Sequence, residues 1–85
     1  MQEVHKCKGE VTALHKIKEI SHEHFKQEIC GFLGYDHKKK EFIIQKEDNI
    51  ATNPQSHFLI NPLSYLLFKD SYSMIAVFHS HIVGD

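Results

Sequence analysis

The hydrophobic pattern of the chain changes its period near Cys30, and this change constrains the fold more than any other feature. From Glu10 onward, apolar residues recur at the spacing of a helix that lays one stripe on a core, which predicts a helix over residues 10–26. The expected core-facing residues are Val11, Leu14, Ile17, Ile20 and His24/Phe25. After the change, short apolar runs are interrupted by glycines, as in buried strands whose backbones approach closely.

The second half of the chain alternates between strand and helix patterns. Residues 30–35 and 42–44 predict an antiparallel hairpin with the lysines of its turn at an exposed tip, and residues 57–60 predict a further short strand. Asn61-Pro62 is typical of a helix start, which predicts a helix over residues 62–72. Its expected apolar face consists of Leu63, Tyr65, Leu66 and Leu67.

The continuous apolar run Met74–Phe78 predicts a central strand that is covered on both faces. An edge strand is also expected around Val4–Cys7. Together these elements predict one domain over residues 1–85, an α/β fold in which helices and a mixed β-sheet form a layered sandwich.

Composition excludes several classes of protein. Ten Lys and no Arg against eleven acidic residues give a net charge of −1, so we expect no nucleic-acid partner. No apolar run approaches the roughly 20 residues that span a bilayer, and Met1–Glu3 does not begin a signal peptide. We therefore expect a cytoplasmic protein with no membrane partner. Its Cys7 and Cys30 are expected to stay reduced.

The chain has eight His, and two of them follow the last apolar run in the sequence His79-Ser80-His81. Side chains two apart on a strand point to the same face, so His79 and His81 could present two imidazoles to one metal ion. With so many His, however, a chance pair at this spacing is also expected. Two partly exposed histidines with no metal are the alternative.

Several motifs in order resemble the JAMM/MPN zinc metalloprotease family, from about the first helix to the last residue. They are Glu28-Ile29-Cys30-Gly31-Phe32-Leu33-Gly34, Asn49, Asn53-Pro54, Phe58-x-Ile60-x-Pro62 and Ala76-Val77-Phe78-His79-Ser80-His81. The resemblance implies the JAB/MPN, cytidine deaminase-like form of the α/β sandwich, incomplete at its C-terminal end. It also implies a hydrolase that cleaves peptide or isopeptide bonds at the tail of a ubiquitin-like or sulfur-carrier protein.

The resemblance also assigns roles to three residues. His79 and His81 would be zinc ligands, and Glu28 would be the general base that takes a proton from the attacking water and passes it to the leaving amine. A solvent-exposed carboxylate at a helix end is the alternative for Glu28. The family's third ligand, an Asp, and its oxyanion-holding Ser would both fall beyond Asp85, and Ile82 replaces a common Pro.

Two interpretations of the missing segment remain open. The 85 residues are either the N-terminal part of a longer domain, which we favour, or a naturally short form that has lost the chemistry. In either case we expect this chain to hold zinc poorly and to be inactive alone, with an exposed apolar face that promotes self-association. The rival functions are a noncatalytic MPN-like interaction scaffold and a structural domain with incidental histidines.

Other candidate residues have simpler interpretations. Cys30 is expected to be a small buried residue rather than a nucleophile, and Ser80 a structural hydrogen-bonding residue. The segment His5–Cys7 is expected to lie at the surface rather than to form half of a metal site. His22 and His24 are two apart on a helix and so should not converge on one metal.

Overall fold

The computed structural model describes residues 3–24, 28–53, 57 and 59–80 and forms a four-stranded sheet with two helices. In chain order the elements are β1 (Glu3–Cys7), α1 (Glu10–Glu23), β2 (Cys30–Asp36), β3 (Glu41–Glu47), α2 (Pro62–Ser71) and β4 (Ser73–His79). The expected α/β class is confirmed. Neither helix has the length and apolar composition that crossing a lipid bilayer requires.

The strands are ordered β1-β3-β2-β4, and every pair of described neighbours is antiparallel. The expectation of a mixed sheet is therefore wrong for the described residues. The physical reason is that two crossover connections, β1–α1–β2 and β3–α2–β4, are interleaved in the sheet. β1 and β2 run in the same direction, as do β3 and β4, but an antiparallel strand separates the members of each pair. Strands that run the same way therefore never become neighbours.

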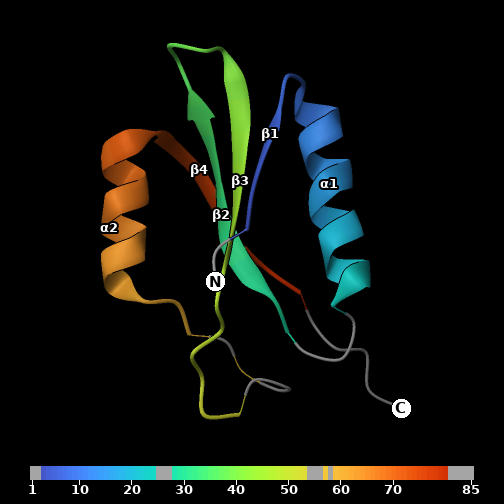
Figure 1. Ribbon diagram of the computed structural model, residues 1–85, viewed down its shortest axis with the longest axis vertical. Helices are drawn as coiled ribbons and strands as arrows, with labels where there is room; N and C mark the ends of the chain where they lie inside the picture. The colour runs from blue at the N-terminus through green and yellow to red at the C-terminus, as the bar shows by residue number, and fades with distance from the viewer. Residues whose placement is uncertain (1–2, 25–27, 54–56, 58, 81–85) are drawn as a thin grey trace.

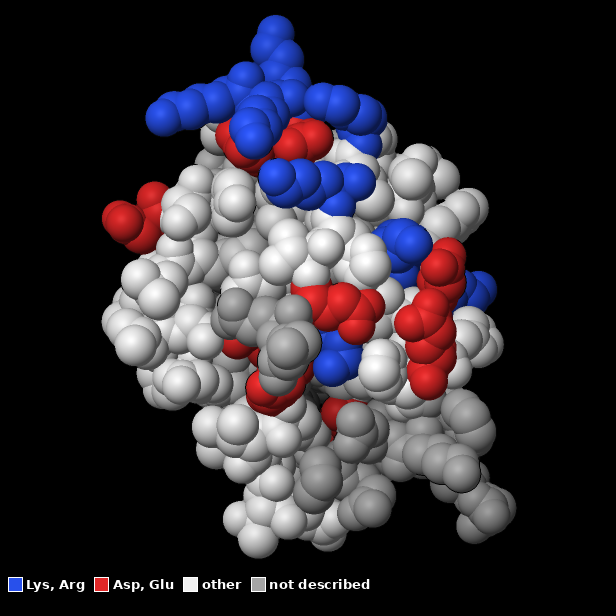
Figure 2. All heavy atoms as spheres, in the orientation of Figure 1, with Lys and Arg blue, Asp and Glu red and all other residues white. Residues whose placement is uncertain are grey.

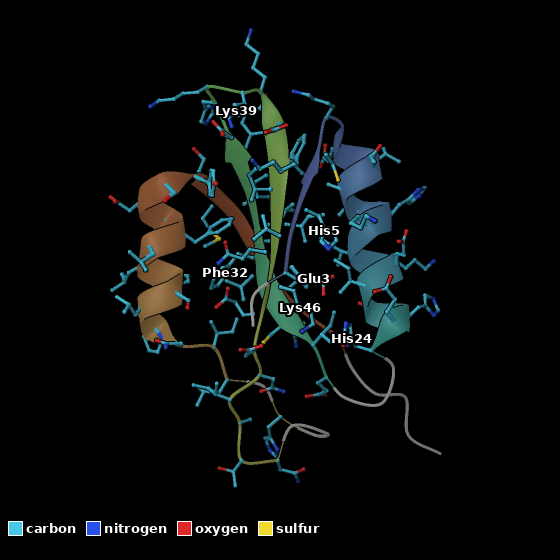
Figure 3. All side chains as sticks on the ribbon, viewed as in Figure 1. Glu3, His5, His24, Phe32, Lys39 and Lys46 are labelled. Carbon is cyan, nitrogen blue, oxygen red and sulfur yellow. The ribbon has the colours of Figure 1, made fainter. Side chains whose placement is uncertain are left out.

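The two helices cover opposite faces of the sheet, so the molecule has three layers (Figure 1). Both crossovers shift the chain in the same direction along the sheet, but they start from strands that run in opposite directions. Because such crossovers are right-handed, the helices must lie on opposite faces. Successive side chains of β2 therefore point to opposite faces of the sheet. Leu33 joins the core under α1, whereas Phe32 points toward α2 (Figure 3). The Phe32 ring packs on Phe68, with 5.1 Å between the ring centroids.

The core-facing stripe of α1 differs from the expected one. Ala13 and Ile20 are buried and Ile17 is partly buried, but Val11 and Leu14 are 67% and 51% exposed. A strict three-residue step moves about 60° around a helix each time. A run that starts at Val11 and continues in such steps therefore reaches the opposite face by Ile20. Phe25 lies outside the described residues.

The helix start at Asn61 is confirmed, because the Asn61 side chain accepts a hydrogen bond from the backbone N–H of Leu63 at 2.9 Å. The expected apolar face of α2 is mostly wrong. Tyr65 and Phe68 face the core, whereas the three leucines are exposed: Leu63 61%, Leu66 60% and Leu67 59%. The described residues 57, 59 and 60 are not in a strand, contrary to expectation.

β4 is an edge strand in the described sheet and not the central, doubly covered strand that its apolar sequence predicts. Ile75 and Val77 are 50% and 45% exposed. The pairing with β2 is also irregular, because Leu33 is opposite Ala76 while Gly34 is opposite Met74. Ile75 is therefore an extra residue in β4, and it locally interrupts the ladder.

The hairpin of β2 and β3 is confirmed, and its turn over residues 37–40 carries the three consecutive lysines. Figure 2 shows blue side chains gathered at this end of the molecule. Lys8 joins them, since its Nζ donates to the backbone oxygen of Lys39 at 3.1 Å. Asp36 stabilises the turn by accepting from the backbone N–H groups of Lys38 and Lys39 at 3.0 and 3.2 Å.

Candidate functional site

The pairing of β2 with β4 brings Glu28 and His79 to the same end of two neighbouring strands. Cys30 is the cross-strand partner of His79. Beyond this pair, the backbone N–H of Ser80 donates to the Ile29 oxygen at 2.9 Å, and the Ile29 N–H donates to the Ser80 Oγ at 3.0 Å. Glu28 directly precedes Ile29, so Glu28 and His79, which are distant in sequence, lie at the same end of the sheet.

The environments of the two predicted site residues differ. Glu28 is buried, with 6% of its surface exposed, and so it is not the solvent-exposed carboxylate of the alternative interpretation. His79 is exposed at the end of β4. The third predicted residue, His81, lies outside the described residues. Ser80 acts as the structural hydrogen-bonding residue that the sequence predicts.

Asn49 connects the loop after β3 to Glu28. Its Nδ2 donates to the backbone oxygens of Glu28 at 3.1 Å and His57 at 2.8 Å. Its Oδ1 accepts from the backbone N–H groups of Ala51 at 3.1 Å and Leu59 at 3.0 Å. One side chain therefore fixes both the fold of the loop and its position beside Glu28. The sequence indicated a loop here but not this role.

Cys30, the cross-strand partner of His79, also forms a buried pair with Glu47. They are cross-strand partners in β2 and β3, and the Cys30 thiol donates weakly to the Glu47 backbone oxygen at 3.9 Å. Burial raises the pKa of the Cys30 thiol to about 11, so it stays protonated near neutral pH and is a poor nucleophile. The complete burial of Cys30 agrees with the expectation of a small buried residue.

Glu47 was missed by the sequence analysis. It is 3% exposed, and its Oε2 accepts a hydrogen bond from Gln45 Nε2 at 2.7 Å. Residues 45–48 form an unbroken polar run, Gln45-Lys46-Glu47-Asp48, which is typical of a solvated strand end rather than of a covered face. Only the position of the strand inside the sheet could show that this face is covered.

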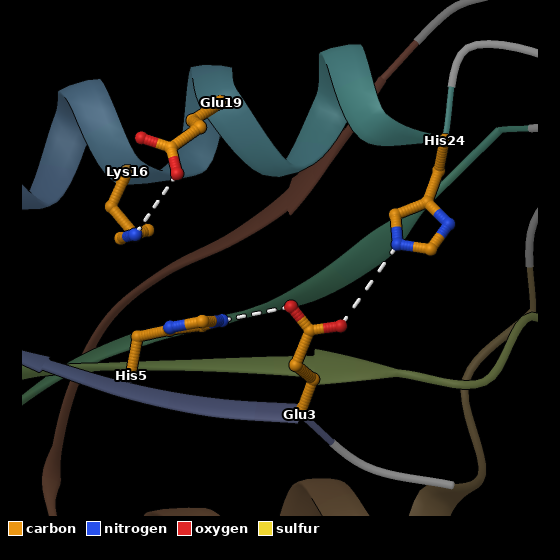
Figure 4. Close-up of polar contacts among 5 residues, drawn as sticks. All are labelled: Glu3, His5, Lys16, Glu19 and His24. Atoms are coloured by element: carbon orange, nitrogen blue, oxygen red, sulfur yellow. Dashed lines mark hydrogen bonds and ion pairs between the residues drawn. The ribbon is translucent and has the colours of Figure 1, made fainter.

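A second group of His and Glu side chains lies between β1 and α1 (Figure 4). Glu3 Oε2 is 2.8 Å from His5 Nε2, and Glu3 Oε1 is 3.9 Å from His24 Nε2. The hydrogen bond from His5 holds the pKa of the Glu3 carboxyl below its ordinary value. The two-residue spacing on a strand could have indicated the first contact, but His24 comes from the end of α1, and no local pattern links it to Glu3.

The donor atoms at the end of β2 and β4 fit zinc in their chemistry. Imidazole is a common zinc ligand, and a carboxylate that is not a ligand can serve as a base beside such a centre. Within residues 3–24, 28–53, 57 and 59–80, no group of three or more His, Cys, Asp or Glu side chains is arranged to hold a metal ion. The described part of the chain therefore contributes one candidate ligand, His79, and one candidate base, Glu28.

Comparisons with protein-family models, with curated proteins and with solved structures find no significant match to this chain.

Proposed function

We propose that this chain is a zinc metallopeptidase domain of the JAMM/MPN type, with His79 and His81 as zinc ligands and Glu28 as general base. The single observation that supports this proposal is the pairing at the end of β2 and β4, where Ile29 and Ser80 exchange two hydrogen bonds. Glu28 just before β2 and His79 at the end of β4 are about fifty residues apart in sequence. A site built from both requires those strands to be neighbours.

In this proposal each residue of the chain has a distinct role. Zinc, when bound, would supply Lewis acidity and lower the pKa of a water molecule toward neutral. The buried Glu28 carboxylate would accept a proton from the attacking water and later donate it to the leaving amine. Asn49 holds the backbone oxygen of Glu28, which restricts where this carboxylate can move.

The substrate class follows from the family resemblance alone. It is the peptide or isopeptide bond at the extended tail of a ubiquitin-like or sulfur-carrier protein. A noncatalytic MPN-like scaffold is the second candidate.

Zinc binding by variants of this chain tests the proposed ligands. We expect His79→Ala to weaken zinc binding at least tenfold and Glu28→Gln to leave it within about twofold, because in this proposal His79 is a ligand and Glu28 is not. His22→Ala is the matched control, since His22 is exposed on α1. Equal zinc binding by His79→Ala and the parent would eliminate the proposed ligand.

A cleavage assay separates the enzyme from the scaffold. Because this chain is expected to be inactive alone, the assay uses a version extended past Asp85 by the Ser and Asp of the JAMM/MPN pattern. This extended version is loaded with zinc and incubated with a ubiquitin-like tail that carries a fluorophore on its terminal amide. Release of the fluorophore by the extended version but not by its Glu28→Gln variant supports the enzyme. A tail that binds to the extended version and stays intact supports the scaffold.

A further inference from the structure

Helix α2 has two apolar faces, and only one of them belongs to the core. Tyr65 and Phe68 pack on the sheet. Leu63, Leu66 and Leu67, here called the leucine stripe, are each about 60% exposed. Because successive residues are about 100° apart around a helix, the leucine stripe is centred opposite Tyr65 and Phe68. It therefore points away from the sheet.

The outer face of α2 differs in charge from that of α1. Exposed Val11 and Leu14 on α1 are interleaved with charged residues such as Lys18 and Glu19. On α2, the leucine stripe is uncharged until Asp70 at its C-terminal end. The neighbouring Lys69 is held aside, with its Nζ 5.1 Å from the centre of the Tyr65 ring. A contiguous apolar surface of this kind is typical of an interaction site.

We propose that the leucine stripe is the contact surface between two copies of this chain, with their α2 helices packed antiparallel across a two-fold axis. A two-fold contact requires one surface that is complementary to itself. In the antiparallel arrangement, Asp70 of each copy lies beside the N-terminal turn of the other α2. That turn contains no acidic residue, and its partial positive charge favours a carboxylate. In a parallel arrangement, the two Asp70 side chains would instead repel each other.

The size of the leucine stripe determines how strong this association can be. Specific interfaces generally bury more than about 1,000 Å² in total, and three leucines from each copy supply only part of such an area. We therefore expect a weak dimer with a dissociation constant near 100 μM. The inference does not depend on the proposed catalytic site, which lies at the end of β2 and β4.

Sedimentation equilibrium over roughly 10 μM to 1 mM, a range that brackets this affinity, tests the inference. The parent should fit a monomer–dimer equilibrium, and Leu66→Lys should weaken the dimer at least tenfold. Leu14→Lys is the matched control, because Leu14 is also an exposed helical leucine. It should associate as the parent does. Circular dichroism checks that both variants keep their helices.

A charge reversal tests the antiparallel orientation. Asp70→Lys should weaken association several-fold at low salt, and high salt should reduce the difference from the parent. A parent that stays monomeric over the whole range would overturn the inference. So would a Leu14→Lys variant that loses association as completely as Leu66→Lys.

Discussion

Single side chains join parts of this chain that are far apart in sequence, and Asn49 does so at the candidate site. It donates to two backbone oxygens and accepts from two backbone N–H groups, in the loop after β3 and at Glu28. A sequence pattern can indicate that Asn favours such a loop. It cannot indicate that Glu28, which precedes β2, lies within reach of the same side chain.

Replacing Asn49 tests this role. We expect Asn49→Ala to lower the free energy of unfolding by roughly 1–3 kcal/mol, because several backbone groups lose their partners. The backbone N–H groups of Ala51 and Leu59 should also exchange faster with solvent. Asn49→Asp keeps the Oδ1 acceptor and should preserve their protection better. Unchanged exchange at both N–H groups in Asn49→Ala would contradict the assigned role.

Glu3 is the second such residue, and its effect on stability should depend on pH. Its pKa is lowered in the folded state mainly by the hydrogen bond from His5. A depressed carboxyl pKa adds stability above the unfolded pKa of about 4.3, and that stability is lost as the pH falls through the folded pKa. The carboxylate is partly exposed, so we expect the contribution to stay below about 1 kcal/mol.

Urea unfolding of the parent and of Glu3→Gln at pH 7 and at pH 3 measures this contribution. At pH 7 the parent should be more stable than Glu3→Gln. At pH 3 the difference in stability between the two should shrink, because protonation makes the Glu3 carboxyl resemble the amide. A difference of the same size at both pH values would show that the interaction is not linked to ionisation.

At the scale of elements, the sequence predicted the existence and order of the helices and strands well, but not which faces are covered. The strand at the N-terminus, the hairpin and both helices occur as expected. The errors are the strand expected over residues 57–60, which the described residues 57, 59 and 60 do not form, the exposed Val11 and Leu14 on α1, the leucine stripe on α2 and the position of β4 in the sheet. Local periodicity reports which residues are apolar. The neighbours of a face are set by the order of strands, which depends on long-range pairing.

The glycines of β2 are an exception, because their sequence signal correctly indicates close packing. A Cβ at Gly31 would clash with the backbone oxygen of Gln45 and would lie 2.6 Å from the Phe78 ring. We expect Gly31→Ala to lower the free energy of unfolding by about 1–3 kcal/mol, since the sheet must shift to make room. Gly9→Ala is the control, because its Cβ would meet only the Thr12 hydroxyl, at 3.8 Å.

Thermal or urea unfolding of both glycine variants gives this comparison. Gly9 lies at the N-cap of α1, where Gly is favoured over Ala by up to about 1 kcal/mol, so Gly9→Ala should lose less stability than Gly31→Ala. An equal loss of stability in the two variants would mean that β2 does not approach β3 and β4 as closely as described.

At the scale of the whole molecule, strand pairing and helix packing bring His and Glu residues that are distant in sequence to two places in the described chain. One is the end of β2 and β4 with Glu28 and His79, and the other is the cluster of Glu3, His5 and His24 between β1 and α1. The sequence predicted Glu28 and His79 as site residues. The cluster of Glu3, His5 and His24 depends on the packing of α1 against β1, which the sequence did not show.

Zinc titration followed by ¹H–¹⁵N spectra of the histidine rings tests the central claim most directly, because it reports on all eight His at once. Imidazoles that bind zinc change their nitrogen shifts strongly, whereas distant rings do not. We predict that the resonances of His79 and His81 change together while those of His5 and His24 stay in place. Changes at His5 and His24, with His79 and His81 unaffected, would contradict the account.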